Sequence, residues 1–121
     1  RFPDMSETYD KELIAKAKKI AASHGIKVQE GIYAGLSGPC LETPAEYMYV
    51  RNVGADTVGM STVPEVIAGR HGGMRCFAVS IITDLGVPGK IVKVTHEDVI
   101  NVAAKAEPKM TLIMKELISQ M

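Results

Sequence analysis

The apolar positions in the first part of the chain recur every three or four residues. Between Ser6 and Gly25 they form one stripe and lysines occupy the opposite face, a pattern typical of an amphipathic helix. The stripe consists of Tyr9, Leu13, Ile14, Ala17, Ile20 and Ala21. We predict a helix that begins near Ser6 and ends at Gly25, because glycine readily adopts the left-handed conformation that terminates helices.

Three later stretches are apolar and short enough to be strands. They are residues 26–36, predicted as a strand or a strand with a bulge, residues 57–61 and residues 75–83. The third stretch is almost continuously apolar, which favours a strand covered on both faces. The sequence Ser37-Gly38-Pro39 ends the first strand.

Helix starts lie between these stretches. Thr43 is placed to cap a helix with Pro44 at its first position and Glu46 closing a capping box, and this helix is expected to run to about Asn52 before Gly54.

Two further helices follow. Residues 62–65 open a helix that ends near residues 72–73. Thr95 caps the last helix, whose first turn is acidic, and Pro108 is expected to kink or split that helix.

The order of these elements predicts the fold class. Helices alternating with strands indicate an α/β fold with a mixed, largely parallel sheet flanked by helices. The carboxyl ends of its strands hold polar groups in residues 37–42, 60–61 and 83–84, so we expect these three segments to converge. A purely structural α/β domain also shows such convergence, so it does not by itself establish a function.

Composition narrows the function classes. The chain has 121 residues, of which 46% are hydrophobic and 23% charged, as in a globular domain. Fourteen basic residues balance fourteen acidic ones, and no basic run argues for nucleic acid. No apolar run is long enough to cross a membrane. We therefore expect neither a nucleic-acid partner nor a membrane partner.

The two cysteines indicate the compartment of the protein, and the first residue indicates how the chain begins. Cys40 and Cys76 are far apart and have no metal-ligand spacing, so we expect two reduced, small buried side chains and a cytoplasmic protein. The chain starts at Arg1 rather than at methionine. We expect a segment of a longer chain, or a processed chain.

Several candidate site residues have ordinary structural interpretations. Glu42 precedes a helix and would favour its dipole, Met60 in a strand would belong to a core, and Ser61 before a helix would cap it. Asp84 after a strand would form a turn, and His96 in a first helical turn would be solvated. The chain has no glycine-rich phosphate loop of the P-loop or dinucleotide type.

Two strings of residues favour functional roles over these structural interpretations. Residues 38–43 read GPCLET and residues 58–65 read VGMSTVPE. With Arg1-Phe2-Pro3 at the start and His96-Glu97 near the end, they closely resemble the trimeric, low-molecular-mass purine nucleoside phosphorylases. The resemblance covers nearly the whole chain. It implies that residues 1–121 are the C-terminal part of a single domain of the nucleoside phosphorylase fold.

The resemblance implies roles for residues around the base. Glu42 matches the glutamate that accepts a hydrogen bond from purine N1–H. Asp84 matches the position, usually asparagine, that bonds N7 and the six-substituent, so these two residues are the catalytic candidates. Leu41 and Val58 match residues that line the base pocket.

The resemblance also implies roles for residues around the sugar and phosphate. Met60 matches the residue that packs under the ribose, Ser61 a serine that contacts phosphate, and His96 the histidine that bonds the 5′-hydroxyl. The main phosphate loop of the family would lie upstream of this chain.

The activity implied is the reversible phosphorolysis of purine ribonucleosides and deoxyribonucleosides, such as inosine and guanosine, to free base and ribose 1-phosphate. Such an enzyme is a pentosyltransferase of purine salvage and works as a homotrimer. Phosphate is a co-substrate and the nucleophile, so no cofactor, metal or covalent enzyme nucleophile is implied. Negative charge builds on the departing base, and a donor at N7 lowers the barrier.

Three other readings remain open. A methylthioadenosine phosphorylase shares Asp84, but those enzymes carry a second aspartate where this chain has Gly86 and lack the glutamate at Glu42. The chain is also consistent with a non-catalytic module that binds purines or nucleosides, or with a structural domain whose motifs are vestigial.

Because two nearby carboxylates tend not to ionise together, a protonated Asp84 would donate to N7 as asparagine does. We therefore expect six-oxopurine nucleosides to stay preferred, with some adenosine activity.

Overall fold

The first helix begins at a capping residue and not at Ser6. In the computed structural model, which describes residues 2–121, helix α1 spans Lys11–Ser23. Asp10 Oδ1 accepts a hydrogen bond from the N–H of Leu13 at 2.9 Å, so the helix starts one residue after Asp10. The helix ends as predicted, because Gly25 follows its last turn with a φ of +64°.

Arg75 holds the capping aspartate in place. Its Nε donates to Asp10 Oδ2 at 2.5 Å, and its Nη2 donates to Asp10 Oδ1 at 2.9 Å and to Glu12 Oε2 at 2.9 Å. The hydrogen bonds from Arg75 keep the pKa of Asp10 well below its usual range. The N–H of Asp10 also donates to the carbonyl of Cys76, so the start of α1 is tied to residues 75–76.

The sheet is parallel, as expected, but short. Strand β1 (Tyr33–Gly35) pairs with strand β2 (Thr57–Gly59), with Ala34 opposite Val58. The predicted strands 26–36 and 57–61 were therefore too long, because only three residues on each side form the ladder.

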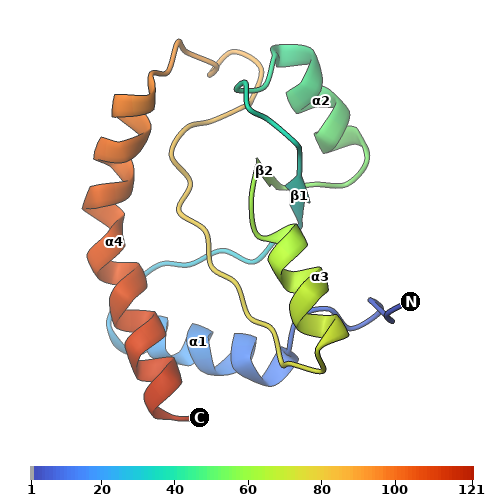
Figure 1. Cartoon of the computed structure of the whole chain (residues 1–121). Coiled ribbons are helices and arrows are strands. Elements are labelled where there is room, and N and C mark those ends of the chain that lie inside the picture. Colours follow the sequence, from blue (N-terminus) through green and yellow to red (C-terminus); the bar gives the residue numbers. More distant parts are fainter. Residues whose placement is uncertain (1) are drawn as a thin grey trace.

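The third predicted strand, residues 75–83, is wrong. This stretch crosses the molecule between α3 and α4 as a segment without regular secondary structure (Figure 1). Within residues 2–121, the backbone of residues 77–83 forms no hydrogen bond to another backbone segment. An apolar sequence favours a strand, but a strand also needs a neighbour to pair with.

The other helices begin where their motifs predict. Helix α2 spans Pro44–Asn52 and α4 spans His96–Ser119, and each starts with a capping box. Helix α3 spans Val63–His71 and has no side-chain cap. Helix α4 continues through Pro108, so the predicted split does not occur.

The main core lies between α1 and α4, which cross at the C-terminal end of α4 (Figure 1). Its buried side chains are Leu13, Ala17, Ile20, Ala21, Ile113 and Leu117. Among residues 2–121 every fully buried side chain is apolar. The cysteines do not both behave as buried hydrophobes: Cys76 is half-buried, but Cys40 is exposed, and both are free thiols.

The architecture confirms the predicted class, a mixed α/β fold with a small parallel sheet and four helices. Within residues 2–121 no helix combines the length and the apolar character that a membrane crossing requires.

The α1–α4 contact predicts the effect of a single truncation. Leu117 is 2% exposed, so Leu117→Ala leaves a cavity and is expected to lower the free energy of unfolding by about 2–5 kcal/mol. The neighbouring Ile118 is 64% exposed, and Ile118→Ala is expected to change it by no more than about 0.5 kcal/mol. Denaturant unfolding of both variants measures the difference, and equal losses would contradict the assignment of this core.

Candidate functional site

The candidate site lies where the two strands of the sheet end. Because β1 and β2 are parallel, the segments that follow them leave the same edge. The N–H of Leu36 donates to the carbonyl of Gly59 at 2.8 Å, which carries the pairing past β1. Residues 37–42 and 60–61 are therefore delivered to one region, as the sequence predicts.

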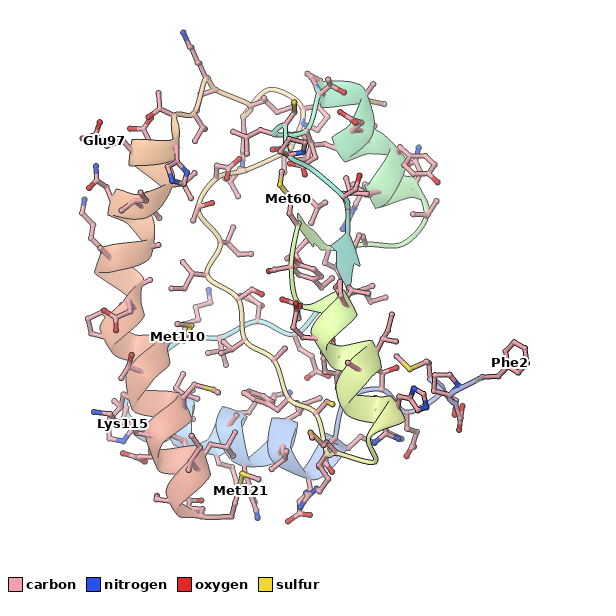
Figure 2. The ribbon with its side chains drawn as sticks, in the orientation of Figure 1. Phe2, Met60, Glu97, Met110, Lys115 and Met121 are labelled. Atoms are coloured by element: carbon pink, nitrogen blue, oxygen red, sulfur yellow. The ribbon has the colours of Figure 1, made fainter. Side chains whose placement is uncertain are left out.

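Met60 lies directly against the turn after β1. Gly38 has a φ of +62°, and a Cβ atom on it would come within 2.5 Å of the sulfur of Met60. Figure 2 shows Met60 at the end of β2, beside the segment that leads into α2. Its side chain is 40% exposed, so Met60 is not a core residue and part of its apolar surface is uncovered.

Ser61 lies at the entrance to α3 without capping that helix. Its Oγ shares a hydrogen bond with Thr62 Oγ1 at 3.3 Å, and α3 has no side-chain cap. Thr62 adopts a φ of 73°, which is unusual for a residue other than glycine. The N–H of Ser61 donates to the hydroxyl of Tyr33 at 3.3 Å, which fixes the turn between β2 and α3.

Glu42 stands just outside the cap of α2. The N–H and hydroxyl of Thr43 both donate to Glu46 Oε2 at 2.7 Å, and the N–H of Glu46 donates to Thr43 Oγ1 at 3.3 Å. These hydrogen bonds from Thr43 lower the pKa of Glu46. Since Glu46 and Thr43 satisfy the helix start, the half-buried carboxylate of Glu42 is left for another partner.

Asp84 reaches the same region from the far side of the chain. The Thr83 hydroxyl donates to its Oδ1 at 2.9 Å, and the Tyr47 hydroxyl donates to its Oδ2 at 3.3 Å. Desolvation and then the charges of Asp84 and Glu42 raise the pKa of Tyr47 to about 12. Glu42 and Asp84 therefore lie close to one hydroxyl group, although they are far apart in the sequence.

The remaining predicted residues are more loosely placed. Leu41 is 51% exposed, and Val58 is half-buried in the middle of β2. His96 is the first residue of α4, is exposed, and forms no hydrogen bond or ion pair within residues 2–121. The starts of α4 and α2 lie at the same end of the molecule (Figure 1). Within the described residues no hydrogen bond or ion pair joins His96 to the carboxylates of Glu42 and Asp84.

The sequence did not single out two tyrosines at this site. Tyr33 supports Ser61, and its hydroxyl lies where a Cβ atom on Gly59 would come within 2.2 Å. Tyr47 supports Asp84. Each lies in an ordinary strand or helix pattern, so no sequence signal distinguishes it from a packing residue.

The chemistry of this arrangement follows from its groups. Two carboxylates lie near one hydroxyl group and can accept hydrogen bonds from N–H donors, and Met60 leaves an apolar surface exposed at the end of β2. Within residues 2–121 no three histidine, cysteine or carboxylate side chains are placed to hold a metal ion. The arrangement can therefore accept hydrogen bonds from a ligand that carries N–H donors.

Comparison with known families agrees with this geometry. The model of the family described as the phosphorylase superfamily matches residues 1–119. The chain belongs to the phosphorylase superfamily. Among its relatives, purine nucleoside phosphorylase 1 of Bacillus subtilis is 42% identical over 120 residues, which cover 99% of this chain and 44% of that protein. The purine nucleoside phosphorylase of Bos taurus is 41% identical over 128 residues, covering 98% of this chain and 43% of the relative.

Solved structures of phosphorylases share the same fold. The Schistosoma mansoni purine nucleoside phosphorylase in complex with inosine matches with a TM-score of 0.91 at 37% identity, over 99% of this chain and 44% of that one. A complex of the Schistosoma mansoni enzyme with adenosine gives the same values. The chain thus spans less than half the length of these superfamily members.

The capping box of α2 predicts the effect on stability of removing one hydroxyl group. Thr43→Ala removes the acceptor for the N–H of Glu46 and is expected to lower the free energy of unfolding by about 0.5–2 kcal/mol. Thr43→Ser keeps the hydroxyl and is the matched control. Denaturant unfolding measures both variants, and an alanine variant as stable as the serine variant would rule out the cap.

Proposed function

We propose that this chain is the C-terminal, purine- and sugar-binding part of a purine nucleoside phosphorylase acting on nucleosides such as inosine and guanosine. The observation that carries the proposal is the meeting of Glu42 and Asp84 around the hydroxyl of Tyr47. The exposed apolar side chains of Leu41 and Met60 support a ligand site here. Leu41 precedes Glu42, Met60 leaves the same edge of the sheet, and neither belongs to the buried core.

The reaction exchanges one bond for another at the anomeric carbon. An oxygen of inorganic phosphate attacks C1′ while the bond from C1′ to purine N9 breaks, and the electron pair of that bond passes to the base. Glu42 accepts a hydrogen bond from N1–H of a six-oxopurine, and Asp84 lies at N7 and the six-substituent. Leu41 and Val58 line the base pocket.

The residues that follow β2 and the first residue of α4 contact the sugar and the phosphate. Met60 packs under the ribose, Ser61 contacts phosphate, and His96 bonds the 5′-hydroxyl. Support for Ser61 comes from its place before the uncapped start of α3, where N–H groups favour an anion. Support for His96 is weaker in this structure, because only its position at the same end of the molecule favours it.

The rest of the catalytic machinery belongs to the remaining part of such an enzyme. The chain spans 44% of the length of its Bacillus subtilis relative, and residues 77–83 have no backbone pairing partner within the described residues. We place the main phosphate loop upstream, and we propose a cytoplasmic homotrimer. The two free thiols agree with a reducing compartment.

A methylthioadenosine phosphorylase is the second candidate, since Asp84 suits a six-amino group. Glu42 argues against it, and so does Gly86. A Cβ atom on Gly86 would come within 2.3 Å of the ring of Tyr47, so the second aspartate of those enzymes does not fit here unless Tyr47 moves.

The role of Glu42 is tested in a full-length enzyme that carries this chain. Glu42→Ala is expected to reduce kcat/KM for inosine at least about a hundredfold, because the N1–H loses its charged acceptor and each tenfold corresponds to roughly 1.4 kcal/mol. Glu30→Ala, which removes an exposed carboxylate paired with Lys18, is the control and is expected to stay within about threefold. Steady-state kinetics decide, and a Glu42 variant as active as the control would assign Glu42 to the helix start alone.

The 121-residue chain by itself is expected to show no measurable phosphorolysis of inosine. Without the upstream phosphate loop the nucleophile is not positioned, and positioning is worth about 7–11 kcal/mol of a barrier. Release of hypoxanthine is followed with and without phosphate. Robust phosphate-dependent release by this chain would mean that its own residues complete the site.

A further inference from the structure

Tyr47 is the residue that joins the two carboxylates of the site. It lies in the first half of α2, and its hydroxyl donates to Asp84 Oδ2 at 3.3 Å. Thr83 donates to the other oxygen of Asp84 at 2.9 Å. Both oxygens of Asp84 therefore receive a hydrogen bond from the chain itself, which fixes the orientation of the carboxylate.

The ring of Tyr47 is held by a glycine. A Cβ atom on Gly86 would come within 2.3 Å of Cδ1 and 2.6 Å of Cε1 of Tyr47. Gly86 does not adopt a positive φ, so its backbone conformation is open to other residues. The ring occupies the space that any side chain at position 86 would need. Gly86 thus allows the hydroxyl to reach Asp84.

The charges around the hydroxyl keep it a donor. Burial and the negative charges of Asp84 and Glu42 disfavour the phenolate, and the pKa of Tyr47 rises to about 12. The other charged groups on this side line an open hollow with Asp84, namely Lys90, Lys93 and Asp98. At neutral pH Tyr47 therefore keeps its proton and points it at a carboxylate.

We propose that Tyr47 is a positioning and specificity-determining residue that holds Asp84 as a hydrogen-bond acceptor beside Glu42. The proposal rests on the proposed function, because its effect is read on purine nucleosides. Because its two oxygens each receive a donor, Asp84 is held in one orientation as an acceptor. In that orientation it accepts from the six-amino group of adenosine, whereas Glu42 accepts from N1–H of inosine. Tyr47 would thereby widen the range of bases toward six-aminopurines.

Removing the hydroxyl alone tests this role. Tyr47→Phe keeps the ring against Gly86 but leaves Oδ2 of Asp84 without its donor, so the carboxylate is no longer held as the acceptor for a six-amino group. In the full-length enzyme the ratio of kcat/KM for inosine to that for adenosine is expected to rise about fivefold, the fold-change that one ordinary hydrogen bond is worth. In an Asp84→Asn background the same change is expected to leave the ratio unaltered, because the amide donates with or without Tyr47.

Two further variants separate positioning from stability. Tyr49→Phe removes a hydroxyl from the same helix at a residue that is 64% exposed, and it is the matched control for Tyr47→Phe. Gly86→Ala displaces the ring and is expected to raise the ratio as Tyr47→Phe does. In a Tyr47→Val background Gly86→Ala is expected to have little further effect, because the ring that it strikes is gone.

The link between Tyr47 and Asp84 is measured without catalysis by ultraviolet difference titration. Subtracting the Tyr47→Phe variant from the wild-type enzyme isolates one phenol, which is expected to titrate near pH 12. In Asp84→Asn the loss of the negative charge is expected to lower that midpoint toward the usual value, although burial still acts on it.

The outcomes are distinct. If the wild-type enzyme splits inosine but Tyr47→Phe lowers both substrates equally, or acts in the Asp84→Asn background too, Tyr47 only supports the fold and the proposal is wrong. A Tyr47 midpoint unmoved by Asp84→Asn also overturns it. If the wild type splits no nucleoside while the midpoint moves, the hydrogen bond exists but the proposed function fails, and with it the assigned role in specificity.

Discussion

The parallel pairing of β1 with β2 is the constraint on which the rest of the site depends. Three residues on each strand form the ladder, and Leu36 carries it one step further. This short pairing decides that the turn before α2 and the turn before α3 emerge at one edge. Met60 is the first residue after β2, and Glu42 lies seven residues after the end of β1. The pairing of the two strands therefore brings both residues to this edge.

Local features of the fold could be predicted from the sequence, and features that need a partner could not. The capping boxes at Thr43 and Thr95 are made by residues three positions apart, so a short sequence motif is enough to predict them. Residues 75–83 have the composition of a strand, yet no described segment pairs with them, and composition cannot supply a neighbour. The site divides in the same way. Glu42 and Asp84 are marked by their motifs, whereas the role of Tyr47 arises from a contact across 37 positions of the chain.

A recurrent device shapes the site: a large side chain occupies the place where a glycine has no Cβ atom. The hydroxyl of Tyr33 lies over Gly59, the ring of Tyr47 over Gly86 and the sulfur of Met60 over Gly38. Each pair brings a backbone segment closer to a side chain than any other residue would allow. In the two tyrosine pairs, the close approach aims a hydroxyl at a defined partner, the N–H of Ser61 in one case and the carboxylate of Asp84 in the other.

The pair of Gly38 and Met60 carries two independent restrictions. The φ of +62° at Gly38 is open to asparagine or aspartate as well as to glycine, but a Cβ atom there would come within 2.5 Å of the Met60 sulfur, so either residue would have to displace that side chain. Shortening Met60 would lift the second restriction and leave the first. A replacement at position 38 is therefore less costly after position 60 has become shorter than before it, because there is then no sulfur to displace. Shape alone thus favours one order of substitutions, before any demand of catalysis is considered.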